Sequence, residues 1–323
     1  MKIAIVGAGA IGAFLGAKLA LSGEDVYLIA RGAHLQAMQN HGVRVKSPDG
    51  DFEAHPTATD DYESVGPVDF VFLTVKAHSL TEIAPQIAPL LGPETVVVSA
   101  QNGIPWWYFQ SQGGPFDGTA IESVDPGGVI AQAIDPSRII GCIIYPSTVI
   151  VQPGVIEHIE GNRFSIGELD GTSSDRCKTL AAALICAGLK APIRSRIRHD
   201  LWVKLLGNVV FNPMSALTGA TLEEMATHPE TSAIARAVMT EADEVAEALG
   251  VRLPLTIDQR MDGAKKVGAH KTSMLQDLES GRPMELESVV GVVIELGEKL
   301  GLPMPHTRTL YSCTRLLSQV RAK

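Results

Sequence analysis

The apolar run VKLLGNVVFNP, residues 203–213, contains three polar side chains, Lys204, Asn208 and Asn212. Their four-residue spacing places them along one face of a helix, with a drift of about 40° per step. Because the other faces are apolar, the helix should be largely buried, and a buried ammonium group without a partner is costly. The polar face is therefore expected to line a wet or ligand-filled cleft, where an ammonium group can stabilise negative charge on oxygen and supply a proton. The competing interpretation is a salt bridge at Lys204 with asparagines that cap loops.

Two residues of the same run affect the helix itself. Gly207 costs about 1 kcal/mol of helix propensity and, next to Asn208, suggests a close approach by another group. Pro213 lacks an N–H donor, so it is expected to kink or end the helix.

A second polar stretch is TSMLQDLESGRPMELE, residues 272–287. The pattern predicts that one helix ends before Gly281 and that Pro283 opens the next, which continues to about Leu300. Glu285 would then lie in a first turn, where position alone favours a carboxylate that complements the helix dipole. Ser273 by itself is an ordinary helix residue.

The elements that must position these groups begin with KIAIV, residues 2–6, which predicts a short buried strand. It runs into GAGAIG and an apolar helix through Leu21. In this context the glycines supply a tight turn, a close approach to a pyrophosphate and close packing of helix on strand. The helix amino terminus favours phosphate, which predicts a dinucleotide site. Its residues are Gly7, Gly9, Ala10, Ile11 and Gly12. The alternative is that the glycines serve packing alone.

The end of the second predicted strand, DVYLIAR at residues 25–31, concerns the choice of cofactor. An NAD site would place an acidic residue there for the ribose 2′-hydroxyl, whereas this chain has Ala30 and Arg31. A guanidinium suits a 2′-phosphate, so the sequence favours NADP(H). The alternative is a solvated surface arginine.

Two further buried strands are predicted in VDFVFLTVK, residues 68–76, and TVVVSAQNG, residues 95–103. Ligands of open parallel sheets bind outside the carboxyl ends of strands, so Lys76 and residues 101–103 should lie near the nicotinamide. Against this, Lys76 could be a surface lysine, and Asn102 before a glycine is typical of a turn. Residues 43–55 predict a hairpin.

The remaining sequence indicates that the chain has two domains. Residues 138–167 predict two or three antiparallel strands that close the sheet, and helical patterns resume near Lys178. We place the boundary at residues 194 and 195. The prediction is an NADP-binding α/β domain at residues 1–194 and an all-α substrate and catalytic domain at residues 195–323.

Composition sets broad limits. The 323 residues, 45% hydrophobic and 20% charged, are typical of about two globular domains. A net charge of −9 without a dense basic patch disfavours binding to nucleic acid. The four cysteines lack CxxC spacing, and no metal site is predicted. With neither a transmembrane segment nor a signal peptide predicted, a cytoplasmic location is expected.

Together these stretches resemble one family, the ketopantoate reductases of the 6-phosphogluconate dehydrogenase-like group. The resemblance spans nearly the whole chain and rests on the order of GAGAIG, Arg31, TVKAH (74–78), QNG (101–103), WVKLLGNVVFNP (202–213) and SMLQDLESGRPMELE (273–287). It implies a Rossmann domain followed by a helical domain, with the active site in the interdomain cleft. It further implies NADPH-dependent reduction of 2-dehydropantoate (ketopantoate) to (R)-pantoate, a step toward pantothenate and coenzyme A.

The same resemblance implies roles for individual residues. Lys204 would be the general acid, and Glu285 would help to position substrate. The side chains expected to bind substrate are Asn208, Asn212 and Ser273, while Asn102 and Lys76 would lie at the junction of cofactor and substrate. The chemistry is consistent, since hydride addition to a 2-keto carbon builds negative charge on oxygen and a lysine is protonated at neutral pH.

One departure leaves alternatives open. IPWWYF follows QNG, and bulky Trp106, Trp107 and Tyr108 would reshape the substrate pocket if they face it, but not if they pack on the Rossmann domain. A reductase of another 2-keto acid is therefore the second hypothesis. A nucleotide-sensing protein without catalysis is the third, although a sensor needs no proton donor. The apolar helical domain allows a homodimer.

Overall fold

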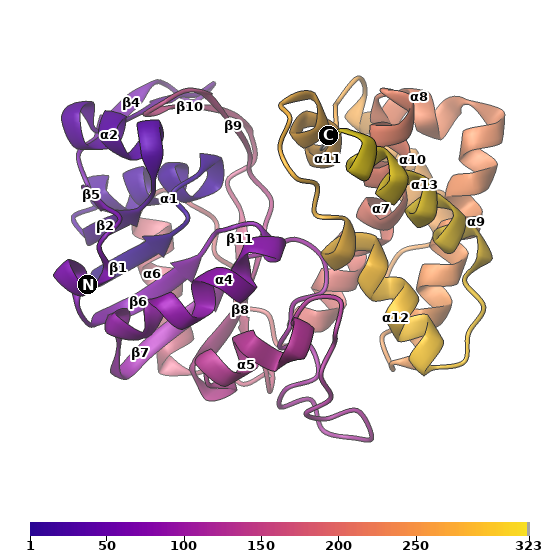
Figure 1. Cartoon of the computed structure of the whole chain (residues 1–323), viewed down its shortest axis with the longest axis horizontal. Coiled ribbons are helices and arrows are strands. Elements are labelled where there is room, and N and C mark those ends of the chain that lie inside the picture. The colour runs from indigo at the N-terminus through magenta and orange to yellow at the C-terminus, as the bar shows by residue number, and fades with distance from the viewer. Residues whose placement is uncertain (322–323) are drawn as a thin grey trace. The chain divides into compact units, whose positions relative to one another are not determined.

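A computed structural model describes residues 1–321, which form two compact units (Figure 1). Unit 1 comprises residues 1–101, 106–120 and 125–197, and unit 2 comprises residues 102–105, 121–124 and those from 198 onward. The chain therefore changes unit within a few residues of the predicted boundary. The two short excursions into unit 2, at 102–105 and 121–124, have no counterpart in the sequence-based division.

Unit 1 is built on a seven-stranded sheet with the order β11-β8-β7-β6-β1-β2-β5. Its strands are β1 Lys2–Val6, β2 Asp25–Ile29, β5 Thr57–Thr59, β6 Val68–Leu73, β7 Leu91–Ser99, β8 Ile139–Ile144 and β11 Phe164–Glu168. All pairs are parallel except β11 with β8. The order reverses at β1, which creates the switch point where doubly wound sheets bind ligands. The predicted Rossmann architecture is confirmed.

The helices of unit 1 connect these strands. They are α1 Ala10–Leu21, α2 Gly32–His41, α3 Tyr62–Val65, α4 Leu80–Ile83, α5 Val129–Ala133 and α6 Asp175–Cys186, with 3₁₀ turns at Ala77–Ser79, Ala84–Leu90, Pro126–Gly128 and Pro136–Arg138. Helix α1 is apolar apart from Lys18 and contacts strands of both sheets of unit 1. Its Phe14 stacks on His158, with ring centroids 4.6 Å apart, and is fully buried.

The second sheet of unit 1 has four strands in the order β4-β3-β10-β9. These are β3 Val43–Lys46, β4 Phe52–Ala54, β9 Ser147–Gln152 and β10 Val155–Glu160. The predicted hairpin is confirmed as antiparallel β3 and β4. The prediction that residues 138–167 close the main sheet is right for β8 and β11 but wrong for β9 and β10. Instead β10 pairs with β3 and β9 pairs with β10, an arrangement in which apolar Ile156 of β10 is fully buried.

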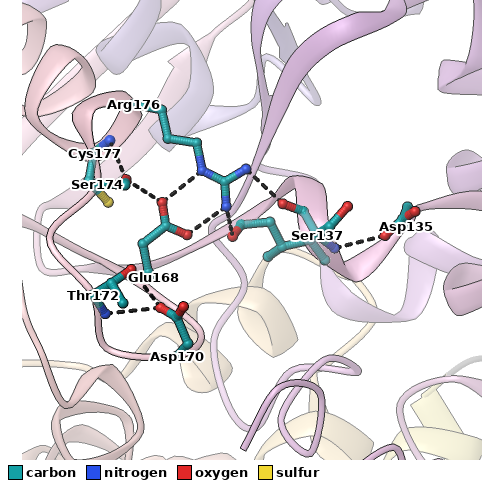
Figure 2. A network of polar contacts seen from close by, with 9 residues as sticks. Asp135, Ser137, Glu168, Asp170, Thr172, Ser174, Arg176 and Cys177 are labelled. Carbon is teal, nitrogen blue, oxygen red and sulfur yellow. Dashed lines mark hydrogen bonds and ion pairs between the residues drawn. The ribbon is translucent and has the colours of Figure 1, made fainter.

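An ion pair between the buried Glu168 and the half-buried Arg176 fastens α6 to β11 (Figure 2). Arg176 donates from Nε and Nη2 to the two carboxylate oxygens of Glu168, at 2.7 and 2.6 Å. Ser174 caps α6 by accepting from the Cys177 amide and also donates to Glu168 at 2.5 Å. Burial raises the pKa of the Cys177 thiol to about 11, so this cysteine stays protonated and serves packing.

The described part of unit 2 contains helices and no strand, as predicted. They are α7 Ile197–Thr218, α8 Leu222–Thr227, α9 Pro229–Ala248, α10 Ile257–Val267, α11 Ser273–Glu279, a π-helical turn Glu287–Gly291, α12 Val292–Lys299 and α13 Pro305–Arg321. Among the helices within residues 1–321, none combines the length and apolar character that a membrane crossing requires.

Pro213 does not end α7, which continues to Thr218. The prediction that Pro213 ends the helix was therefore wrong. The alternative prediction, a kink at Pro213, stays a prediction. The turn that follows is buried, with Met214 3% and Ser215 0% exposed. Burial of this turn offsets the hydrogen bond that proline cannot donate.

Candidate functional site

The glycine loop lies at the carboxyl end of β1 in unit 1. Gly7 has φ +93°, and a Cβ there would lie 2.4 Å from a methyl group of Val75. A Cβ on Gly12 would lie 2.5 Å from the carbonyl oxygen of Gly7, so helix and loop are packed at a distance that only glycine allows. These two contacts agree with the predicted turn and packing roles.

Gly9 differs from its neighbours because nothing crowds it. A Cβ there would meet no atom closer than 3.9 Å, which leaves its backbone accessible to a ligand. It caps the twelve-residue helix α1, whose first turn begins with Ala10 and Ile11 and carries no acidic side chain. Free N–H groups and a positive dipole end at this place suit a diphosphate.

Arg31 and Lys76 lie at the ends of the strands that flank β1. Arg31 is exposed and follows β2 directly as the cap of α2. Lys76 is half-buried and caps the 3₁₀ turn Ala77–Ser79. The strand predicted through Lys76 ends at Leu73, so this lysine lies beyond the sheet edge. Both cations are therefore on the carboxyl side of the switch point.

His34 belongs to the same region and was missed by the sequence analysis. Its Nδ1 accepts from the amide of Gly154 at 3.0 Å, which joins α2 to the β9–β10 turn. Burial lowers its pKa, and the backbone of Ala8 in the glycine loop partly opposes this. The imidazole is thus neutral at physiological pH, which leaves Nδ1 able to accept from Gly154. No local signal identifies it, because Gly154 is 120 residues away.

Gln101 was expected near the cofactor but has a structural role. Its side chain accepts from Ser99 Oγ at 2.8 Å and donates to the carbonyl oxygen of Leu73 at 2.7 Å. It is 8% exposed, and these bonds join the ends of β6 and β7. Its amide therefore serves the sheet.

The chain enters unit 2 at Asn102 through a tightly packed glycine. Gly103 has φ +85°, and a Cβ there would lie 1.8 Å from the carbonyl oxygen of Ser288. Ile104 donates its amide to that same oxygen at 3.0 Å. Asn102 Oδ1 in turn accepts from Lys204 Nζ at 2.6 Å. The ammonium group is thus oriented by an amide from a segment about 100 residues earlier in the chain.

Helix α7 carries the predicted polar face. Lys204 and Asn208 are half-buried, and Asn212 is 7% exposed. The carbonyl oxygen of Asn212 accepts from Ser215 Oγ at 2.8 Å, and this hydroxyl lies 2.6 Å from Thr272 Oγ1. Because Thr272 caps α11, these bonds anchor the start of that helix to α7.

Ser273 is the first residue of α11 and is exposed. It directly follows Thr272, whose hydroxyl contacts Ser215 in the turn after Asn212, so the start of α11 lies beside that turn. This location is not apparent from the sequence, where Ser273 is an ordinary helix residue.

Glu285 is 7% exposed and lies before the last pair of helices. The prediction that Pro283 opens a helix is wrong by three residues, since regular structure starts at Leu286. A π-helical turn follows, a feature that is frequent at functional sites. The hydroxyl of Ser288 in this turn donates to the Glu285 carbonyl oxygen at 3.5 Å, and the Ser288 carbonyl oxygen accepts from the Ile104 amide. Ser288 therefore contacts both the Glu285 backbone and the segment that follows Asn102.

The aromatic residues after QNG belong to unit 1. Trp106, Trp107 and Tyr108 are at most 3% exposed. Trp107 packs over Gly141 of β8, where a Cβ would lie 2.7 Å from its ring. Packing on the Rossmann domain is therefore the alternative that the structure favours.

The predicted site residues divide between the units. Unit 1 contains Gly7, Gly9, Ala10, Ile11, Gly12, Arg31 and Lys76, and unit 2 contains Asn102, Lys204, Asn208, Asn212, Ser273 and Glu285. The first set can hold a phosphorylated dinucleotide. The second joins an ammonium group, amides, a hydroxyl and a carboxylate, which can bind a polar anion and transfer a proton.

Comparison with known proteins agrees with this arrangement. Residues 3–106 match the family model "Ketopantoate reductase PanE/ApbA", and residues 196–318 match "Ketopantoate reductase PanE/ApbA C terminal". The sequence is 50% identical over 322 residues to the 2-dehydropantoate 2-reductase of Mesorhizobium japonicum, with 99% of each chain covered.

Solved structures extend the comparison. A candidate ketopantoate reductase from Ralstonia solanacearum MolK2 has a TM-score of 0.94 at 41% identity, covering 99% of this chain and 98% of that one. A D-mandelate dehydrogenase in complex with NADH and anilino(oxo)acetate has a TM-score of 0.86 at 22% identity, covering all of both chains. The latter likeness concerns the fold alone.

Proposed function

This chain belongs to the ketopantoate reductase family, and we propose that it reduces 2-dehydropantoate to (R)-pantoate with NADPH, a step toward pantothenate and coenzyme A. One observation carries the proposal. Lys204 lies on a face of α7 that also presents Asn208 and Asn212, and its Nζ donates a hydrogen bond to Asn102. A protonated amine held this way is suited to a carbonyl oxygen that gains charge.

A bound nicotinamide would supply the hydride for C2 of the keto acid, and the carbonyl oxygen would then gain the negative charge that the residues of unit 2 must meet. Lys204 stabilises that oxygen and transfers its proton to it, which yields the hydroxyl group. Asn102 fixes the direction of the ammonium group. Glu285 positions substrate beside it, and the amides of Asn208 and Asn212 together with the Ser273 hydroxyl pair with substrate oxygens.

NADP(H) is the proposed cofactor, and it supplies the hydride when bound. The loop of Gly7, Gly9 and Gly12 and the first turn of α1, at Ala10 and Ile11, would hold its diphosphate. Arg31 would pair with the 2′-phosphate, because the end of β2 offers a guanidinium where an NAD site has a carboxylate. Lys76 and Asn102 are proposed to contact the nicotinamide half.

The proposal also covers organisation and setting. The change of unit after Ile197 supports domains close to residues 1–194 and 195–323, which limited proteolysis would test. We place the enzyme in the cytoplasm as a homodimer, to be checked by light scattering. A net charge of −9 supports the absence of a nucleic-acid partner.

The test is the loss of NADPH absorbance when ketopantoate is added to the purified protein, with NADH in parallel. Lys204→Ala is expected to lower kcat by about 10²- to 10⁴-fold, the usual contribution of a general acid. Lys265→Ala is the matched control, because this exposed lysine of α10 pairs with Asp262 at the surface.

Three results would contradict parts of the proposal. Turnover of other 2-keto acids but not ketopantoate would overturn the substrate. A Lys204→Ala rate equal to that of Lys265→Ala would overturn the acid. Tight NADPH binding without turnover of any keto acid would favour the nucleotide-sensing alternative.

A further inference from the structure

A second cation lies one helical turn from Lys204. A Cβ on Gly207 of α7 would lie 1.9 Å from Nη2 of Arg260 and 2.5 Å from both its Cζ and its Nε. The guanidinium of α10 therefore rests on the bare backbone of α7, in space that any other residue would fill. This contact explains why a glycine is placed in the middle of a buried helix.

The position of Gly207 fixes the position of the guanidinium relative to the predicted site. Residues three apart on a helix are neighbours on its surface, at about 5–6 Å between Cβ atoms, so Gly207 adjoins Lys204. It also immediately precedes Asn208. Arg260 is half-buried and its Nε is shielded from solvent, so the side chain is held in place at this face.

The chemistry of a 2-keto acid leaves a role for such a group. Among the side chains proposed to bind substrate, Lys204 is used at the keto oxygen, the amides and the hydroxyl are neutral, and Glu285 is an acid. The carboxylate on the adjacent carbon still needs a cationic partner. A planar guanidinium pairs with a carboxylate through two parallel hydrogen bonds, which fixes orientation as well as affinity.

We infer that Arg260 binds the carboxylate of the 2-keto acid substrate and that Gly207 exists to admit its guanidinium. The inference rests on the proposed function, because it assigns a further substrate-binding residue to the same reaction. Arg260 would orient the substrate so that its keto oxygen meets Lys204, and it would select acids over neutral ketones.

The test compares four variants with the wild type at saturating NADPH. Arg260→Met is expected to raise KM for ketopantoate by about 10- to 100-fold and to change kcat much less, since charge-assisted pairing is lost. Arg260→Lys keeps the positive charge but loses the planar guanidinium, so its KM for ketopantoate should lie between those of the wild type and Arg260→Met. Gly207→Ala should raise KM while the arginine is retained, and alanine favours the helix, so folding is not expected to suffer.

Arg236→Met is the matched control. Arg236 of α9 pairs with Asp258 Oδ1 in the first turn of α10 at 2.5 Å, so its loss loosens the same helix without touching Gly207. Its KM should remain within twofold of the wild-type value. Inhibition by pantoate and by its neutral lactone gives a second measurement, because Arg260→Met should abolish the preference for the acid.

A KM for Arg260→Met equal to that of Arg236→Met, or an unchanged preference for pantoate over the lactone, would overturn the inference. The wild-type rate with ketopantoate separates this result from failure of the proposed function. If the wild type reduces a different 2-keto acid, the same variants are assayed with that acid and its reduced product.

Discussion

Replacing Gly103 with alanine should disable the site without unfolding the protein. The added Cβ would lie 1.8 Å from the Ser288 carbonyl oxygen and 3.1 Å from the Val289 amide nitrogen. An ordinary contact between such atoms needs about 3.5 Å, so the segment must move by roughly 1.7 Å. A displacement of this size carries Asn102 away from Lys204.

The energies can be compared from the same geometry. An L-residue at φ +85° costs about 1–2 kcal/mol, and loss of the Ile104–Ser288 bond costs about 0.5–1.5 kcal/mol. The free energy of unfolding should therefore fall by about 1.5–3.5 kcal/mol. Catalysis should suffer more, because a 1 Å misplacement of catalytic groups can cost about 100-fold in rate.

The assay is kcat/KM for ketopantoate together with urea denaturation, with Gly23→Ala as control. Gly23 has φ +95° and open space around it, so the control carries the backbone strain without the clash. It should lose about 1–2 kcal/mol and keep the wild-type kcat/KM. Wild-type kcat/KM in Gly103→Ala would refute the role of the Gly103–Ser288 contact in placing Asn102.

Three further predictions concern the cofactor and the scaffold. Arg31→Ala should raise KM for NADPH by about 10- to 100-fold and leave KM for NADH unchanged. The control Arg44→Ala removes a surface arginine paired with Glu53 and should alter neither KM. Equal effects of Arg31→Ala on both cofactors would contradict the contact with the 2′-phosphate. Arg176→Met should lower the free energy of unfolding in urea by about 1–3 kcal/mol, because the carboxylate of Glu168, with a side chain 6% exposed, keeps its bond from Ser174 but loses its cationic partner. Adding Glu168→Gln should recover part of that loss, and no recovery would argue against an uncompensated charge. For Glu241, burial raises the pKa of the carboxyl but hydrogen bonds from Thr307 and His306 outweigh it, so the net pKa lies below the ordinary 4.5. The stabilisation is then complete above pH 4.5 and is lost as the pH falls through the lowered pKa, so the deficit of Glu241→Gln in the free energy of unfolding should be constant at neutral pH and shrink in acid. A deficit that persists unchanged in acid would contradict this linkage.

Local patterns in the sequence were enough for much of the fold. The buried strand before Gly7, the apolar helix after it and the polar face of Lys204, Asn208 and Asn212 all appear in the structure. They do so because the periods of strands and helices are set by backbone geometry and can be recognised within a dozen residues. The glycines at 7 and 12 were recognised from the local glycine pattern between strand and helix, although the group that crowds Gly7 is the distant Val75.

The sequence was less reliable where the competing energies are tertiary. Pro213 remains inside α7 because packing of the following turn offsets its missing hydrogen bond. Strand β10 leaves the main sheet and pairs with β3, where its Val155 and Ile156 are buried, and β9 follows by pairing with β10. Neither preference is contained in the residues themselves, since burial depends on what the rest of the chain provides.

The chemistry of the site was decided by contacts between distant parts of the chain. Asn102 meets Lys204, and Arg260 meets Gly207, only because the helices of unit 2 bring these segments together. The sequence alone established which residue types were available and that something approaches Gly207. The identity of the approaching group depends on tertiary packing, because no period or spacing relates residues that are 50 or 100 positions apart.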